Sequence, residues 1–234
     1  MLDGIASADL IDRQSISDKV YHHVKALILS GVLKSGEKIP EIKVAKHFQV
    51  SRTPVREAIR KLSEYGLVII KPRSFSFVAT ISDKEASDIS QVRLWLERLA
   101  ARSFAMSATP ESLAPLRVLA RKCKEAIERR DLAAVHEYDS QLHLEIAERT
   151  GNTELIRILR TLDAKLQLLR LKQQALRLQQ HVPFETLTFY LDQHEILIQL
   201  IENKEIAKID ELLERHIVHD LDAHSEGVGA QIRS

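Results

Sequence analysis

The chain has 234 residues, of which 44% are hydrophobic and 29% charged, a balance that excludes general disorder. Only 7 Gly and 6 Pro exclude collagen-like and low-complexity sequences, and an aromatic content of 5% favours a helical protein over an all-β one. The net charge of +1 hides an asymmetry. Residues 15–80 contain 12 Lys and Arg against 5 Asp and Glu, whereas residues 81–234 contain 21 against 25. This division predicts a basic nucleic-acid-binding domain followed by a domain of another kind.

The single cysteine, Cys123, excludes an internal disulfide and a metal site built from cysteines. The N-terminal residues show no basic start followed by an apolar run, and no stretch approaches the roughly 18 apolar residues of a membrane span. We therefore expect a cytoplasmic protein. We expect Cys123, which has basic neighbours, to be an exposed helical cysteine, and Trp95 to lie in the core or in an interface.

Three helices are predicted in the basic region. The first begins at Asp18 and ends before Gly31, which tolerates the left-handed conformation common at helix ends. A short second helix covers residues 41–48. The third follows Ser51, a suitable N-cap, and has Pro54 in its first turn, where a missing N–H costs no helical hydrogen bond.

The third predicted helix has an apolar face and a basic face. Arg52, Arg56 and Arg60 recur every four residues, and Thr53 lies beside them. Guanidinium groups and a hydroxyl near a helix N-terminus suit DNA phosphates and guanine edges. This pattern is typical of a recognition helix.

A β-hairpin is predicted next, because residues 67–71 and 75–80 are short and rich in Val, Ile and Phe, with Arg73 at the tip between them. Three helices and a small hairpin make a winged helix-turn-helix, so residues 15–80 are expected to form a DNA-binding domain. The alternative is a small helical domain whose arginines form a solvated face. The order of short helix, tight turn, capped basic helix and hairpin favours DNA binding.

Residues 31–39, 50–59 and 62–67 resemble the GntR family of bacterial transcription regulators, most specifically in the string VSRTPVREA. The resemblance implies DNA contacts from Ser51, Arg52, Thr53, Arg56 and Arg73; Arg60, on the same face, completes the predicted set. Gln49 stands where the family usually has Gly. A residue other than Gly at that position costs about 1 kcal/mol where the backbone is left-handed.

The remainder of the chain is predicted to be helical. Six helices are expected, roughly over residues 83–106, 110–129, 131–150, 152–180, 183–203 and 205–225. Their short connections predict an antiparallel bundle over residues 83–225. A Gly-rich phosphate loop and a βαβ pattern are both missing from the sequence, so nucleotide-binding folds lose support.

Four ionisable residues on apolar helix faces form a candidate metal site. Asp139 and His143 are four residues apart and so share one helix face, while His194 and His216 are flanked by core-type residues on two other helices. Three imidazoles and one carboxylate suit a divalent metal ion. The alternative is that these are satisfied or solvated side chains, as we expect for the other seven histidines.

The second domain also resembles a known one, the FadR-type (FCD) ligand-binding domain of GntR regulators. The similar segments are Arg93-Leu-Trp-Leu-Glu97, Asp139-x-x-x-His143 with Gly151-Asn152, Gln193-His194, and Arg215-His216. The resemblance implies that the aspartate and the three histidines hold a divalent metal, zinc or nickel, with a small carboxylate effector bound beside it. The six predicted helices are more similar to the VanR-type branch than to FadR itself.

Arg93 has two interpretations. Its guanidinium suits a bidentate clamp on the effector carboxylate. The alternative is an i,i+4 salt bridge with Glu97, worth a few tenths of a kcal/mol. The residue pattern does not separate the two.

We therefore expect a homodimeric, metabolite-responsive transcription regulator rather than an enzyme, with two recognition helices on the half-sites of a pseudo-palindromic DNA operator. One alternative is a metal-dependent hydrolase with a basic head, because His/Asp clusters can activate water. No histidine follows His194 by four residues, so the HExxH protease motif is absent. A second alternative is a DNA-binding protein with a purely structural metal.

Overall fold

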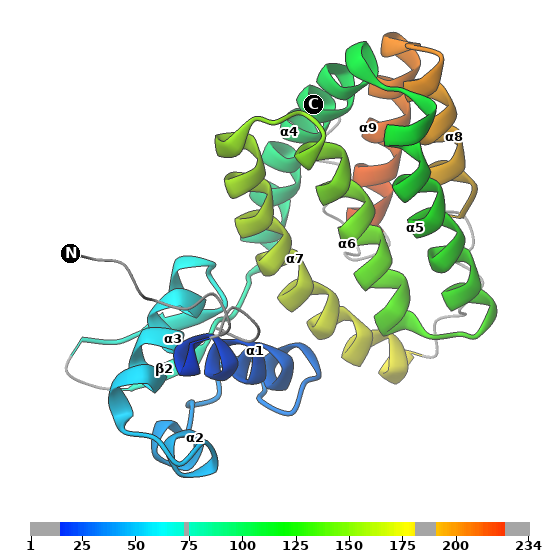
Figure 1. Ribbon diagram of the computed structural model, residues 1–234. Helices are drawn as coiled ribbons and strands as arrows, with labels where there is room; N and C mark the ends of the chain where they lie inside the picture. The colour runs from blue at the N-terminus through cyan, green and yellow to red at the C-terminus, as the bar shows by residue number, and fades with distance from the viewer. Residues whose placement is uncertain (1–14, 73–74, 181–190, 223–234) are drawn as a thin grey trace, which may run out of the picture. The chain divides into compact units, whose positions relative to one another are not determined.

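The chain divides into two compact units, Met1–Thr80 and Ile81–Ser234 (Figure 1). The computed structural model describes residues 15–72, 75–180 and 191–222 of them. The predicted fold class is confirmed, because the first unit is a winged helix-turn-helix and the second is helical. None of the helices in the described ranges is both long and apolar enough to span a bilayer.

The first unit has three helices and a two-stranded sheet. Its elements are α1 (Ile16–Leu29), α2 (Glu41–His47), α3 (Arg52–Glu64), β1 (Val68–Ile70) and β2 (Ser76–Val78). The strands are antiparallel, and their register pairs Val68 with Val78 and Ile70 with Ser76. The predicted hairpin is therefore confirmed, with shorter strands than expected. Its tip, including Arg73, lies outside the described residues.

The core of the first unit lies between α1 and α3. Val20 and Val24 on α1, and Val55 and Leu62 on α3, are fully buried. Their helical spacing leaves the basic face of α3 in contact with solvent. Packing of the apolar stripe therefore fixes which way the arginines point.

A strained turn joins α2 to α3. Gln49 has a φ of 54°, so the backbone at this position is left-handed, and the side chain is exposed. An L-residue with a Cβ is disfavoured there by roughly 1–2 kcal/mol relative to the right-handed conformation. Gln49 stands where the family usually has Gly, and the backbone strain expected at this position is present in the structure.

Replacing Gln49 with Gly should stabilise the first unit by about 0.5–1 kcal/mol, because relief of the left-handed strain exceeds the extra chain entropy of Gly. Native-state hydrogen exchange of the α3 amides measures this free energy within the unit. Ser30→Gly is the matched control, since Ser30 is an exposed helix end with a φ of −87°. The argument would be contradicted if the α3 amides exchanged more slowly in Ser30→Gly but not in Gln49→Gly.

The described part of the second unit contains six helices. They are α4 (Asp83–Ser107), α5 (Pro110–Glu128), α6 (Leu132–Glu148), α7 (Thr153–Gln180), α8 (Leu191–Glu202) and α9 (Ile206–Asp222). Several begin at capping residues: the side chains of Ser82 and Asp131 accept hydrogen bonds from first-turn amides, and Thr109 forms a capping box. The helix predicted to begin at residue 183 is described from Leu191 onward; residues 183–190 lie outside the described ranges.

These helices form two layers. Figure 1 shows α5, α6 and α7 side by side, with α4, α9 and α8 behind them. Large side chains such as Phe104, Leu116, Leu142 and Ile201 fill the space between the layers and are almost fully buried. Polar side chains placed on the inner face of α4, α6, α8 or α9 are consequently forced together inside an apolar core.

Two side-chain expectations need correction. Cys123 was expected to be exposed, but it is buried, with 2% of its surface accessible. It packs with Ala126, Ile127 and Val135. Burial raises the pKa of its thiol to about 12, so its basic neighbours in sequence do not activate it. Trp95 is 67% exposed, which excludes the core as its location in this unit.

Candidate DNA-binding face and metal centre

The N-cap and one face of α3 present the predicted DNA-contacting groups of this helix to solvent. Ser51, Arg52, Thr53, Arg56 and Arg60 are all exposed. Ser51 occupies the N-cap position, as predicted, but its hydroxyl caps no amide among the described residues. The hydroxyl is therefore available at the helix N-terminus, where backbone N–H groups also favour a phosphate.

Glu41 is a residue of this face that the sequence analysis did not single out. Its carboxylate lies 3.8 Å from Arg52 Nη2 and 3.7 Å from Arg56 Nε, and it accepts a hydrogen bond of 3.0 Å from Ser76 Oγ on β2. The Glu41 side chain is 15% exposed, whereas those of Arg52 and Arg56 are 56% and 65% exposed. One carboxylate on α2 thus restrains two of the arginines predicted to contact DNA and links them to the wing. An acidic residue near an arginine cluster was the available signal.

The second unit brings the four predicted metal ligands together. Asp139 and His143 come from α6, His194 from α8 and His216 from α9. One donor atom from each lies within 4.8 Å of the others. The three histidines are at most 6% exposed, and the Asp139 side chain is 13% exposed. Residues separated by up to 77 positions in sequence therefore form one buried cluster.

The donor atoms face a common centre. Asp139 Oδ1 lies 3.0 Å from His194 Nε2 and 3.6 Å from both His143 Nε2 and His216 Nε2. The last two nitrogens are 3.1 Å apart. A metal ion about 2.1 Å from each donor would place neighbouring donors about 3.0–3.4 Å apart, depending on geometry. The observed spacings are close to that range.

Further side chains orient the candidate ligands from outside. His143 Nδ1 lies 2.7 Å from Glu97 Oε2, and His216 Nδ1 lies 2.7 Å from Gln193 Oε1. Both oxygens are acceptors, so each Nδ1 carries the proton and each Nε2 faces the centre. Arg170 Nη2 donates to Asp139 Oδ2 at 2.5 Å. Such outer partners are usual at histidine metal sites.

Opposing influences set the protonation of the cluster. Burial raises the pKa of Asp139, but Arg170 and the hydrogen bonds of the three histidines hold it well below its usual range. Burial lowers the pKa of His143, yet Glu97 and Asp139 outweigh it and raise the value to about 9. Burial, with the positive charge of His143, lowers the pKa of His216 to about 4 despite Asp139. A metal ion must therefore displace a proton from His143.

The donor set fits a divalent metal. Three imidazoles and a carboxylate are borderline-soft ligands of the kind that zinc and nickel take. The 3.1 Å contact between two imidazole nitrogens also needs a proton or a cation between them, since two lone pairs repel. The residues present can thus hold a metal ion.

A cavity of about 10 Å³, large enough for one water molecule, adjoins the cluster. Arg93, Glu97, Ser140, His143 and Asp163 line its polar side, and four leucines line the rest. Small as it is, this cavity connects a candidate metal ligand with a buried arginine. It therefore lies where a small anion would meet both.

The structure supports part of each interpretation of Arg93, the salt bridge with Glu97 and the clamp on an effector carboxylate. Its guanidinium pairs with Glu97, and both side chains are about 5% exposed, so this ion pair is buried rather than solvated. Burial makes its loss more costly than the few tenths of a kcal/mol expected for an exposed pair. Arg93 also borders the cavity. Glu97, Gln193 and Arg170 were not predicted as site residues, since their roles depend on neighbours from other helices.

These two units define the class of protein, a DNA-binding regulator in which a winged helix is joined to a separate helical domain. The family described as "bacterial regulatory proteins, gntR family" matches residues 16–78, and the FCD domain matches residues 88–219. The chain therefore belongs to the GntR family and carries an FCD domain.

Known relatives agree with this assignment. The gluconate operon transcriptional repressor of Bacillus licheniformis is 26% identical over 195 residues, which cover 83% of this chain and 79% of that repressor. YdhC, an HTH-type transcriptional regulator of Bacillus subtilis strain 168, is 35% identical over 107 residues, or 46% of this chain. That match spans 48% of YdhC, about half of its length.

A solved structure shares the fold. Escherichia coli McbR/YncC superposes with a TM-score of 0.77 at 20% identity, over 94% of this chain and 99% of McbR/YncC. At that level of identity the similarity concerns the fold, which here includes both units.

Glu41→Gln should reduce discrimination between specific and non-specific DNA by about tenfold, because one well-placed arginine contact is worth roughly 1–3 kcal/mol. Non-specific affinity should rise, since a negative charge beside the phosphates is lost. Fluorescence anisotropy with both kinds of duplex measures the ratio. Glu128→Gln, which removes the same charge from an exposed position of the helical unit, should leave the ratio unchanged; an unaltered ratio in Glu41→Gln would refute the restraint.

The double variant His143→Ala, His194→Ala should lose the bound metal, because two of four donors are removed. Elemental analysis after metal loading and desalting should find about one ion per parent chain and much less in the variant. His22→Ala removes an exposed histidine of the first unit and should leave the metal content unchanged. Equal metal content in parent and double variant would count decisively against the site.

Proposed function

We propose that this protein is a metabolite-responsive transcription regulator, in which a small carboxylate bound beside a metal ion in the helical unit changes affinity for an operator. Within this proposal the protein acts in the cytoplasm as a homodimer on a pseudo-palindromic operator, and it belongs to the VanR-type branch. Its metal is zinc or nickel. The observation that carries the proposal is the convergence of three histidine Nε2 atoms and Asp139 Oδ1 next to a cavity bordered by Arg93.

The DNA is read by the exposed groups of α3. Arg52 and Arg56 reach guanine edges or phosphates, Ser51 and Thr53 bind phosphates at the helix start, and Arg60 contributes positive charge along the same face. Arg73 contacts DNA from the wing. The positive charge of residues 15–80 supports the same assignment, because phosphate contacts dominate affinity for DNA.

When bound, the metal would supply a positive charge and a Lewis acid to which an oxygen atom of the effector coordinates. Asp139, His143, His194 and His216 hold it. Arg93, which lines the same cavity, binds the effector carboxylate through two parallel hydrogen bonds. The leucines of the cavity exclude water and so strengthen both interactions.

Effector binding is coupled to DNA through the shape of the helical unit. The cavity holds only one water, so even a small acid must displace the leucines and helices that enclose it. Arg93 and Glu97 lie on α4, which begins three residues after the end of the first unit. The effector favours one arrangement of α4 over another, and operator affinity changes by that difference in binding free energy.

The proposal is tested with metal-loaded protein and duplexes that tile the region upstream of its own gene. A thermal-shift screen of small carboxylates identifies a ligand, which is then added to the anisotropy assay. The expected change in operator affinity is about 5- to 150-fold, as for typical allosteric coupling. Failure of the protein to bind any of these duplexes at low ionic strength would overturn the proposal.

Two variants separate the functions of the two units. Arg56→Ala should lose specific DNA binding and keep the carboxylate-dependent thermal shift. Arg93→Lys, which keeps the charge beside Glu97 but loses the planar fork, should bind DNA and metal normally and lose most of the carboxylate response. The assigned roles would be contradicted if Arg56→Ala lost the carboxylate response and kept specific DNA binding, and Arg93→Lys lost DNA binding and kept the carboxylate response.

A further inference from the structure

Asp163, on α7, is a carboxylate of the cavity that the proposed function does not use. The side chain is partly buried and accepts two hydrogen bonds. Ser140 Oγ donates to its Oδ1 at 2.5 Å, and Gln167 Nε2 donates to its Oδ2 at 2.8 Å. Both donors are neutral, and Asp163 forms no ion pair with any residue that the structure describes. Its negative charge is therefore stabilised by hydrogen bonds alone.

The other charged groups of this cavity have partners. Arg93 pairs with Glu97, and His143 donates from Nδ1 to Glu97 while its Nε2 faces the metal cluster. Asp163 thus adds a negative charge, on the α7 side of the cavity, that neither Arg93 nor His143 neutralises. A charge in a partly apolar cavity is costly unless a group of opposite charge meets it.

The amide of Gln167 provides a second acceptor beside Asp163. Its Nε2 donates to Asp163, and its Oε1 is buried without a hydrogen-bond partner in the described part of the chain. An ammonium group has three donors, so it can serve the carboxylate and this oxygen together. A hydroxyl group has one hydrogen and can serve only one of them. The two acceptors therefore suit an ammonium group better than a hydroxyl group.

We propose that Asp163 and Gln167 bind an ammonium group of the effector, so that the ligand of this cavity is a small amino acid and not a simple carboxylic or hydroxy acid. The proposal rests on the proposed function, which places the effector carboxylate at Arg93. Arg93 and Asp163 line a cavity the size of one water molecule, so only a small molecule separates them. A carboxylate and an ammonium group on one short carbon skeleton reach both.

Ser140 connects the ammonium subsite with the metal cluster. Its hydroxyl donates to Asp163 and accepts a hydrogen bond of 3.0 Å from Arg170 Nη1, while Arg170 Nη2 donates to Asp139. A cation at Asp163 competes with the Ser140 hydroxyl for the carboxylate and so changes how Arg170 holds a candidate metal ligand. Binding of the amino acid and of the metal ion are thereby coupled through α6 and α7.

The first test compares matched ligands on the metal-loaded full chain. Each set contains an amino acid, a hydroxy acid and a plain acid of similar skeleton: glycine, glycolate and acetate; alanine, lactate and propionate; aspartate, malate and succinate. Isothermal titration calorimetry measures each Kd, and metal content is checked after each titration because free amino acids also bind metal ions. In at least one set the amino acid should bind about 10- to 100-fold more tightly than its partners, as expected for a hydrogen bond between charged groups.

The proposal is overturned if the amino acid binds no more tightly than the hydroxy acid and the plain acid in every set. That outcome includes the case in which none of the compounds binds.

Two variants separate recognition by Asp163 from a purely structural contact. Asp163→Asn removes the charge but keeps an oxygen that accepts from Ser140; it should lose the preference for the amino acid and still bind the plain acid, which shows that it is folded. Ser140→Ala removes the same hydrogen bond between α6 and α7 but keeps the charge, so it should retain the preference. Retention of the preference in Asp163→Asn, or an equal loss in both variants, would overturn the proposal.

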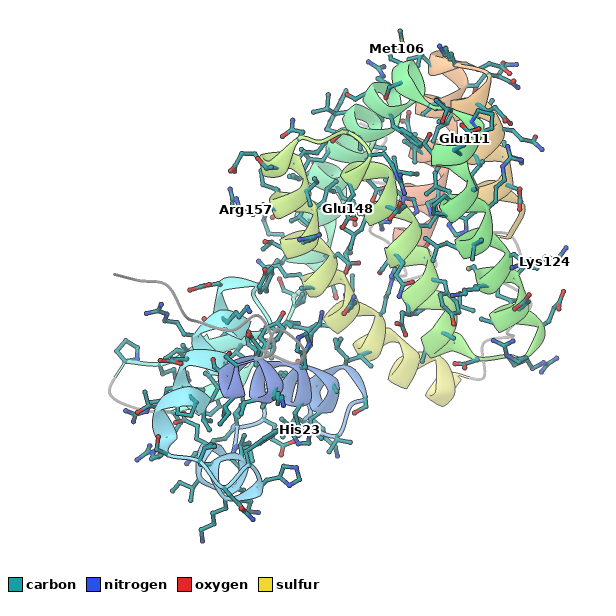
Figure 2. The ribbon with its side chains drawn as sticks, viewed as in Figure 1. His23, Met106, Glu111, Lys124, Glu148 and Arg157 are labelled. Atoms are coloured by element: carbon teal, nitrogen blue, oxygen red, sulfur yellow. The ribbon has the colours of Figure 1, made fainter. Side chains whose placement is uncertain are left out.

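Glu148→Gln is the matched control. Glu148, labelled in Figure 2, is the last residue of α6 and pairs with Arg160 of α7 at 2.7 Å. It therefore joins the same two helices through a carboxylate, but it does not line the cavity. The control should keep the preference for the amino acid. Loss of the preference in Glu148→Gln would attribute it to the packing of α6 on α7 and would overturn the proposal.

These results are distinguishable from failure of the proposed function. A plain or hydroxy acid that binds most tightly and changes operator affinity overturns the ammonium subsite and leaves the proposed function intact. An amino acid that binds through Asp163 without any effect on operator affinity supports the subsite and overturns the proposed function.

Discussion

Burial of the Asp139 carboxylate among three histidines is the constraint on which the helical unit depends. An isolated buried carboxylate would be strongly destabilising, and this one is held by Arg170 and by the imidazoles around it. The ligands come from α6, α8 and α9, so the four groups are compatible only when these helices pack in one arrangement. The cluster therefore specifies the relative positions of the helices, and a bound cation would strengthen that specification by mass action.

The cluster is connected to α4 through a short chain of charged groups. Glu97 contacts both Arg93 and His143, and burial keeps all three at close range in a medium of low dielectric. A change at the arginine, such as the approach of an anion, alters the field at a metal ligand, and the reverse also holds. Within the proposed function, this reciprocity gives the bundle a physical means of responding to a metal ion and an acid together.

The winged-helix unit applies a related principle at its surface. Glu41, the first residue of α2, lies close to two arginines of α3, and Ser76 of the wing donates to the same carboxylate. Long side chains that contact DNA lose entropy when they are fixed, so a carboxylate that restrains them beforehand lowers the cost of binding. The strained turn at Gln49 sets the entry of α3 in the same unit.

Local patterns in the sequence determined the helices, their caps, the hairpin and the division of charge, because these depend on neighbours within a few residues. The i,i+4 spacing of Asp139 and His143, with two histidines on apolar faces, made these four residues candidate ligands, and the resemblance to the FCD domain was what favoured a metal over satisfied side chains. Only the tertiary structure decided that Arg93 and Glu97 form a buried pair beside a cavity, that Glu41 reaches two arginines, and that Cys123 is buried. Each of these depends on side chains from separate helices meeting in three dimensions. Exposure of Trp95 was likewise decided by which face of α4 the other helices cover.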